Sequence, residues 1–111
     1  MPTICVIYSA KDAKNADDYE KYLKQKKIPL LRSQPMIKSW NVYRIDAVLE
    51  PAGTQPPYQF VGIGEVSSIE EFAKANQTPE MRAFRQEYMA YLDPAKIIGG
   101  FTMGHKVEPG T

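Results

Sequence analysis

The stretch from Thr3 to Tyr8 constrains the fold of this chain more than any other part of its sequence. Its residues are β-branched or apolar at successive positions, without the polar alternation of a half-exposed strand. This pattern predicts a β-strand that is buried on both faces. The chain has 111 residues, 43% of them hydrophobic and 24% charged, which indicates one globular domain over residues 1–111. A chain of this length buries only about two-thirds of its unfolded surface, so a second subunit could usefully extend its core.

Residue patterns predict four strands and two helices along the chain. The strands are predicted at residues 3–8, 37–49, 58–66 and 97–107. The first helix is predicted from Ala16 to about Lys27, with Asn15 as its N-cap and Pro29 as the residue that kinks or interrupts it. The second helix is predicted to begin at the capping-box pattern of residues 67–70 and to restart at Pro79. Residues 50–57, with three prolines and one glycine, are predicted to form a loop.

The order strand, helix, strand, strand, helix, strand is that of the ferredoxin-like fold. It predicts an α+β protein with a four-stranded antiparallel sheet. Two helices cover only one face of such a sheet, whereas the first strand and parts of the third and fourth are apolar on both faces. The simplest cover for the second face is another copy of the same chain, because symmetric dimers are the commonest oligomers. We therefore expect a homodimer with the architecture of a dimeric α/β barrel.

Charge and residue counts exclude several classes of function. The net charge is +1, so no basic field draws in phosphate backbones, and we expect no nucleic-acid partner. No apolar run approaches the roughly 20 residues of a membrane span, and the first residues lack the features of a signal peptide. We therefore expect no membrane partner and a cytoplasmic location. One cysteine and one histidine supply neither a disulfide nor a structural zinc site, and we expect no cofactor.

Five short segments occur in the order found in one group of dimeric α/β barrels. They are Asp18-Tyr-Glu-Lys-Tyr, Ile28-Pro-Leu-Leu, Ile37-Lys-Ser-Trp-Asn-Val-Tyr-Arg, Pro56-Pro-Tyr-Gln-Phe and Thr78-Pro-Glu-Met. Over residues 2–99 the chain resembles the RedY-like, or HapK-type, proteins, and it is similar more distantly to the EthD family. The resemblance implies a role in the biosynthesis of prodiginine-type and related pyrrole or indole pigments. There such proteins are implicated in the condensation or cyclisation of reactive aromatic intermediates.

One position departs from the pattern of these families. Two residues before the proline of the first-helix motif, EthD-like members usually have His and RedY-like members often have an acidic residue, whereas this chain has Lys27. An unperturbed lysine is protonated near neutral pH and serves only as a cation or a hydrogen-bond donor. Burial would lower its pKa. We therefore expect Lys27 to be a polar residue of the substrate pocket.

Two residues are candidates for general acid–base catalysis. Glu65 lies near the end of the third predicted strand, where partial burial would raise its pKa towards a value useful for proton transfer. The alternative is an acid that meets water or pairs with a lysine. His105 is the only histidine and alternates with apolar residues on the last predicted strand. Its ordinary pKa lies near neutrality and suits acid–base work, but a packing role at the core or the dimer interface is the alternative.

Four tyrosines are candidates for substrate binding, because a tyrosine offers an apolar wall with a polar tip. They come from the first two strands and the first helix, and they are Tyr8, Tyr19, Tyr22 and Tyr43. We expect one or two of them to contact a flat aromatic ligand and the others to pack in the core. Gly62 and Gly64 leave space on one face of the third strand, where a ligand or a large neighbouring ring could approach the backbone.

These observations favour a cofactor-independent enzyme that promotes condensation or cyclisation of an aromatic or pyrrolic intermediate, of lyase or isomerase type. The sequence holds no nucleophile elbow, phosphate-binding loop or paired histidines, so any site is built from scattered residues. Two alternatives remain open at this point. One is a binding or accessory protein that sequesters such an intermediate without catalysis, and the other is a cofactor-free monooxygenase.

Overall fold

The computed structural model describes residues 1–110, and its elements follow the predicted order. In chain order they are β1 (Thr3–Ala10), α1 (Ala13–Tyr22), the π-helix η1 (Leu23–Lys27), α2 (Ile28–Arg32), β2 (Ile37–Arg44), β3 (Phe60–Val66), α3 (Ile69–Ala75), α4 (Pro79–Met89) and β4 (Leu92–Thr102). The strands form one sheet in the order β2-β3-β1-β4, and every neighbouring pair is antiparallel. This is the predicted ferredoxin-like topology.

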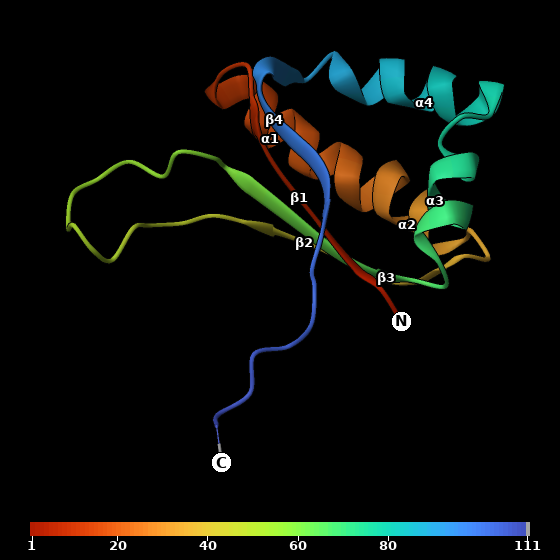
Figure 1. The fold of residues 1–111 in the computed structure, drawn as a ribbon. Helices are drawn as coiled ribbons and strands as arrows, with labels where there is room; N and C mark the ends of the chain where they lie inside the picture. Colours follow the sequence, from red (N-terminus) through yellow and green to blue (C-terminus); the bar gives the residue numbers. More distant parts are fainter. Residues whose placement is uncertain (111) are drawn as a thin grey trace.

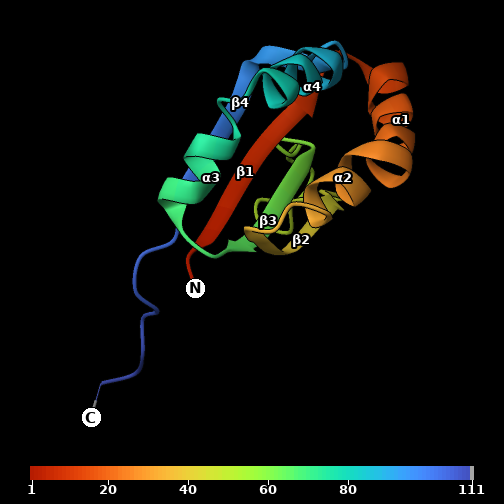
Figure 2. The ribbon, with the colours of Figure 1, turned by 90° about the vertical axis from the view of Figure 1, so that its right-hand side faces the viewer.

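All the helices lie on one face of the sheet, in two groups. Figures 1 and 2 show α1, η1 and α2 on one side and α3 and α4 on the other, with β1 running between them. The core fills the space between helices and sheet, where Tyr8 and Phe60 stack with ring centroids 5.5 Å apart and Tyr19 packs edge-on against both. A second core cluster contains Trp40 and Val66. Burial of such large side chains stabilises the fold by about 1.5–3 kcal/mol each.

The first helix begins earlier than predicted. Its N-cap is Asp12, whose carboxylate accepts a hydrogen bond from the Asn15 backbone N–H at 2.8 Å, so the prediction of Asn15 as the cap was wrong. Either residue type can cap a helix, and the sequence places one three positions before the other. Only Asp12 takes the extended backbone conformation that a cap requires. The capping-box pattern of residues 67–70 has Ser67 as its N-cap, but in the structure the N-cap of α3 is the next residue, Ser68.

The last strand also begins earlier than predicted, at Leu92 instead of Ile97, and it ends at Thr102. Asp93-Pro94 resembles the end of a helix, but α4 ends at Met89 and Pro94 lies inside β4. Proline is tolerated there because β4 is an edge strand, so one side of its backbone has no strand to bond. His105 therefore lies beyond the sheet, and the prediction that it alternates along the last strand was wrong.

The loop between β2 and β3 is longer than predicted, because β2 ends at Arg44 and β3 begins at Phe60. It extends away from the helices at one end of the sheet (Figure 1). The face of the sheet opposite the helices is uncovered by the rest of residues 1–110 and is largely apolar. We call it the outer face, and its apolar members are Cys5, Ile7, Tyr43, Val61, Ile63, Ile98 and Phe101.

Candidate functional site

A cleft of about 550 Å³ lies between the sheet and the helices. Its walls come from β1, β2, β4, the helices α2 to α4 and the end of η1, and most of them are aromatic or aliphatic. The larger apolar lining residues are Val6, Tyr8, Leu31, Trp40, Phe72, Met81, Phe84, Tyr88, Met89, Leu92 and Ile97. Three charged or amide side chains join them, from Lys27, Asn76 and Arg85. The volume and the few polar groups match those of small-molecule sites.

Lys27 is the one charged side chain among residues 1–110 that is buried, with 8% of its surface exposed. Its Nζ donates a hydrogen bond to the Tyr19 hydroxyl at 2.6 Å and lies 3.8 Å from the centroid of the Tyr88 ring. No carboxylate in this part of the chain pairs with it. A buried lysine is ordinarily paired with an acid. The Lys27 amine is instead held by the aromatic side chains around it.

Burial lowers the pKa of Lys27 to about 7, and the nearby positive charge of Arg85 acts in the same direction. The face of the Tyr88 ring stabilises the ammonium form through a cation–π contact. Near neutral pH the amine is therefore present in both protonation states. A group of this kind accepts and returns a proton at the pH where it works.

The hydrogen bond from Lys27 continues into the core through two phenols. The Tyr19 hydroxyl, which is fully buried, donates to the Tyr8 hydroxyl at 3.2 Å. Burial raises the pKa of Tyr8 to about 12 and raises the pKa of Tyr19 further, so both phenols stay protonated. The two hydroxyls thus hold the amine in place and link it to the wall of the cleft that Tyr8 lines.

The π-helix η1 explains why Lys27, and not its neighbour, enters the cleft. The buried face of this helix carries Tyr19 and Tyr22 of α1 and Leu23 of η1. A regular α-helix would next place Lys26 on that face. In η1 the Ile28 N–H bonds to the Leu23 carbonyl, five residues back. This turn contains one extra residue, so Lys27 takes the buried position. Lys26 points to solvent and pairs with Glu87.

Pro29 supplies the local cause of that π-turn. An α-helix would require residue 29 to donate to the carbonyl of Gln25, but proline has no N–H and its ring would clash with that carbonyl. The wider turn changes the hydrogen-bond register just before Pro29, at the point where η1 continues into α2. The predicted interruption at Pro29 thus takes the form of a π-turn within one continuous helix.

Trp40, on β2, forms another wall of the cleft, and the two glycines of β3 make room for its ring. A Cβ at Gly64 would lie 2.2 Å from Trp40 Cε3, and a Cβ at Gly62 would lie 3.4 Å from Cζ2. Of the two predicted uses of this space, the large neighbouring ring is the one observed. Because the indole lies flat against the strand, a flat wall faces the cleft.

The structure separates the predicted site residues into two sets. Tyr8 and Lys27 line the cleft, and Tyr19 bonds to both from behind. Tyr22 packs in the core beside Phe84 and Tyr91 rather than in the lining. This distribution agrees with the expectation that some tyrosines reach the pocket while others pack.

The other set lies outside the cleft. Tyr43 and Glu65 are exposed on the outer face, on β2 and β3, and His105 is exposed beyond β4. The sequence predicts Tyr43 and Trp40 on opposite faces of the same strand. In the structure, the face of β2 that carries Trp40 packs against the helices. The acid–base roles of Glu65 and His105 and the ligand role of Tyr43 stay predictions, which only substitution can test.

Sequence reasoning missed two polar lining residues. Arg85 lies four residues after Met81 and four before Met89, so helical spacing on α4 could have placed it beside the apolar stripe. Asn76 follows the end of α3, and no sequence pattern marks it.

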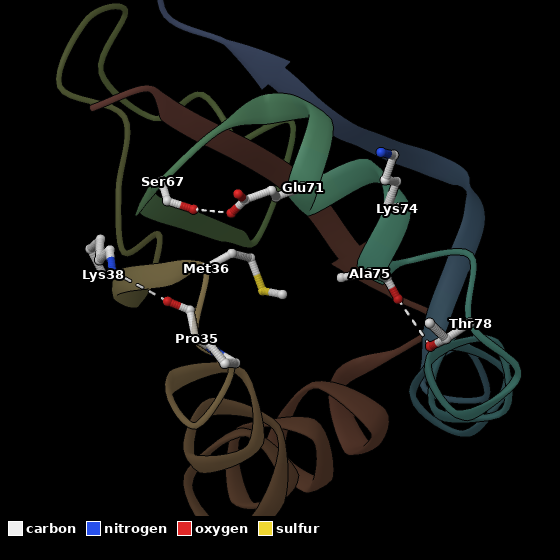
Figure 3. Close-up of a pocket in the computed structure, with 8 residues that line it drawn as sticks. All are labelled: Pro35, Met36, Lys38, Ser67, Glu71, Lys74, Ala75 and Thr78. Atoms are coloured by element: carbon white, nitrogen blue, oxygen red, sulfur yellow. Dashed lines mark hydrogen bonds between the residues drawn. The ribbon is translucent and has the colours of Figure 1, made fainter.

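A second hollow, of about 500 Å³, lies between the start of β2 and α3 (Figure 3). Its polar groups bond to one another: the Ser67 hydroxyl donates to Glu71 at 2.5 Å, and Thr78 donates to the Ala75 carbonyl at 3.0 Å. Lys38 likewise reaches the Pro35 carbonyl at 3.3 Å. This hollow offers no buried titratable group, so we take the cleft at Lys27 as the candidate site.

Neither a metal cluster nor a membrane-spanning helix occurs among residues 1–110. No set of three or more His, Cys, Asp or Glu residues in this range is placed to hold a metal ion. No helix in the same range has the length and apolar character to cross a membrane.

Comparisons with known proteins place the chain among small α+β proteins. The model of a family described as REDY-like protein HapK matches residues 2–102. The crystal structure of HapK from Hahella chejuensis superposes with a TM-score of 0.72 at 17% identity, over 99% of this chain and 100% of that one. No curated protein sequence matches the chain.

Two other solved structures share the fold. An EthD-family protein from Bacillus halodurans gives a TM-score of 0.70 at 17% identity, over 96% of this chain and 99% of that one. A dimeric ferredoxin-like protein of unknown function from Thermobifida fusca gives 0.58 at 16% identity, over 94% and 90%. These likenesses confirm the α+β ferredoxin-like fold.

Proposed function

Because this chain belongs to the HapK family of REDY-like proteins, we propose that it is a cofactor-independent enzyme that acts on an aromatic or pyrrolic biosynthetic intermediate. The reaction is a condensation or cyclisation in the biosynthesis of a pigment or a related secondary metabolite. The observation that carries this proposal is the buried amine of Lys27 in an apolar cleft large enough for such a ligand. Tyr8 and Lys27 form one polar end of the substrate site, and Tyr19 holds the Lys27 amine from behind.

The cleft suits a flat aromatic ligand. Tyr88 and Trp40 supply ring faces against which a planar molecule packs, and Arg85 and Asn76 supply polar contacts to its substituents. Holding two reactive centres of such a molecule together is worth several kcal/mol of the barrier, because the orientation is fixed before reaction.

Lys27 supplies the proton transfers that condensation or cyclisation requires. In its neutral form the amine takes a proton from an acidic C–H or N–H of the substrate, while the bound intermediate builds negative charge on a carbonyl oxygen. The ammonium ion then returns the proton to that oxygen or to a leaving group. General acid–base help of this kind contributes about 10²- to 10⁴-fold to a rate.

A non-catalytic binding or accessory protein is the second candidate. The observation that favours it is the position of Glu65 and His105, the two predicted acid–base residues, outside the cleft of this chain. Such a protein would use the same apolar walls to shield a reactive intermediate from water.

Native mass spectrometry on protein purified gently from its own host identifies any retained small molecule, which then serves as substrate in a turnover assay. We expect Lys27→Met to lower turnover by about 10²-fold or more. Glu65→Gln and His105→Ala test the sequence prediction, because full activity in both would show it to be wrong. A retained ligand that the wild-type protein never converts would favour the accessory role.

A further inference from the structure

We propose that Lys27 is a nucleophile that forms a covalent imine with an aldehyde or ketone bound in the cleft. The inference rests on the proposed function and deepens it, since it names a carbonyl compound as the substrate class. It starts from the placement of the Lys27 amine at the wall of a 550 Å³ cavity, buried to 8% exposure and without an acidic partner.

The surroundings of Lys27 favour reaction at nitrogen over a structural role. A structural buried lysine ordinarily forms an ion pair, and Lys27 forms none with the carboxylates of residues 1–110. Its single hydrogen bond, to Tyr19, leaves the rest of the amine directed at aromatic surfaces. Desolvation in an apolar pocket beside another cation is a known way to activate a lysine for imine formation.

The groups that face the amine come from every element packed around it. Tyr8 lies on β1, Tyr19 on α1, and Arg85 and Tyr88 on α4. Arg85 and burial both favour the neutral amine, while the three phenols stay protonated because burial raises their pKa values. Near neutral pH both forms of the Lys27 amine are thus present, whereas roughly one in 2,500 ordinary lysine side chains is unprotonated at pH 7.

The imine step balances without an oxidant or reductant. The lone pair of neutral Nζ attacks the carbonyl carbon, and the C=O π electrons move to oxygen, which takes up a proton to give a carbinolamine. The hydroxyl takes up a proton from solvent and leaves as water while the nitrogen lone pair forms the C=N bond, which gives the protonated iminium. Loss of the remaining N–H proton to solvent gives the neutral imine. The positive iminium replaces the ammonium ion over the Tyr88 ring.

An iminium carbon is more electrophilic than the parent carbonyl carbon, which is the benefit for a condensation. An electron-rich carbon of the second reactant forms a bond to it, and the C=N pair returns to nitrogen. The nitrogen then takes up a proton, the newly bonded carbon of the second reactant loses one, and the C–H electron pair forms a C=C bond as the C–N bond breaks, which releases the Lys27 amine for another cycle. The reaction thus splits one difficult addition into easier steps.

The test uses 2-naphthaldehyde as a flat aromatic carbonyl probe with sodium cyanoborohydride, which reduces an imine to a stable secondary amine. Intact-mass measurement and peptide mapping at pH 7 locate the naphthylmethyl group. We expect labelling of Lys27 to exceed that of any exposed lysine by roughly tenfold or more, and to be lost in Lys27→Met. The matched control is Lys24→Met, one turn away on the exposed surface, which should label as the wild type does.

A second measurement separates failure of the imine from failure of the cleft. Trp40 is the only tryptophan and lines the cleft, so its indole N–H gives one NMR signal that reports on occupancy and folding. 2-Naphthylmethanol has the same ring system but cannot form an imine. If both compounds shift this signal and Lys27 is labelled no more than Lys24, the imine is overturned and the aromatic site stands. If neither compound shifts the signal, both proposals are overturned.

Discussion

Burial of Lys27 lowers the pKa of its amine, and this makes the stability of the protein depend on pH. The pKa is about 7 in the folded chain against the ordinary 10.5, so the unfolded chain binds more protons between those values. Below about pH 7 the buried amine is charged in the folded state, and the free energy of unfolding is lowered by the full desolvation penalty. Stability therefore rises as pH increases through the interval, and above it the cost disappears.

We expect the free energy of unfolding of the wild type to increase by about 2 kcal/mol from about pH 7 to about pH 9, relative to Lys27→Met. Methionine has a similar length and no charge, so this contribution disappears in the variant. Urea denaturation at several pH values measures it, with Lys24→Met as the exposed control. Parallel pH profiles for wild type and Lys27→Met would contradict the assignment.

Two elements decide how the cleft is built: the π-turn of η1 and the glycines of β3. In each element, the special backbone property of one residue, a proline or a glycine, determines where a larger side chain lies. Pro29 shifts the helix register so that Lys27 faces the core, and Gly64 leaves space into which the Trp40 ring fits.

Pro29→Ala restores the N–H that an α-helical bond to the Gln25 carbonyl needs, and it removes the clash. We expect the helix to become regular, with Lys26 rotating into the core and Lys27 moving to solvent. Titration of ¹³C-labelled lysine side chains by NMR then shows the pKa of Lys27 returning towards its ordinary value. If Lys27 keeps a pKa of about 7 in this variant, the π-turn has a cause other than Pro29.

Gly64→Ala forces a methyl group against Trp40 and also against the Ser39 carbonyl, which would lie 2.9 Å away. We expect a loss of about 1–3 kcal/mol of stability, measured as a lower melting temperature, because the rigid ring and the backbone both have to move. Gly62→Ala, with its nearest contact at 3.4 Å, should cost less, and Gly104→Ala meets nothing within 4 Å. Equal losses in all three variants would contradict this account.

The whole molecule is more extended than its length requires, and one face of its sheet is apolar. The radius of gyration is 15.2 Å, whereas a compact chain of this length has one of roughly 13 Å. Figure 1 shows the β2–β3 loop and residues 103–110 projecting from the sheet. The extended shape and the apolar outer face both fit the expectation that a second copy of the chain packs against that face.

We expect native mass spectrometry to give twice the chain mass of 12.6 kDa for the wild type. Ile63→Lys should yield a monomer, because it places a charge in the middle of the apolar outer face. Ile69→Lys is the matched control, since Ile69 has the same 39% exposure but lies on α3. A monomeric wild type would overturn the proposed homodimer, and a dimeric Ile63→Lys would place the interface elsewhere.

The sequence by itself determined the order of the elements and hence the ferredoxin-like fold. The alternation on β2 and β3 and the apolar run of β1 are local patterns with a period of two, and they survive in the sheet because strand geometry fixes them. Helix and strand ends were less predictable. Asp12 and Asn15 are both good caps, and Pro94 is compatible with a turn or an edge strand, so non-local packing made the choice.

Only the tertiary structure decided which residues form the site. Periodicity separates Trp40 from Tyr43 but does not say which face meets the helices, because that depends on how the whole sheet is covered. Helical spacing placed both Lys26 and Lys27 near the apolar stripe, and a π-turn of one extra residue buried the second. The low pKa of Lys27 follows from its burial and from the charge of Arg85 on α4, which is distant in sequence, so no local pattern could show it.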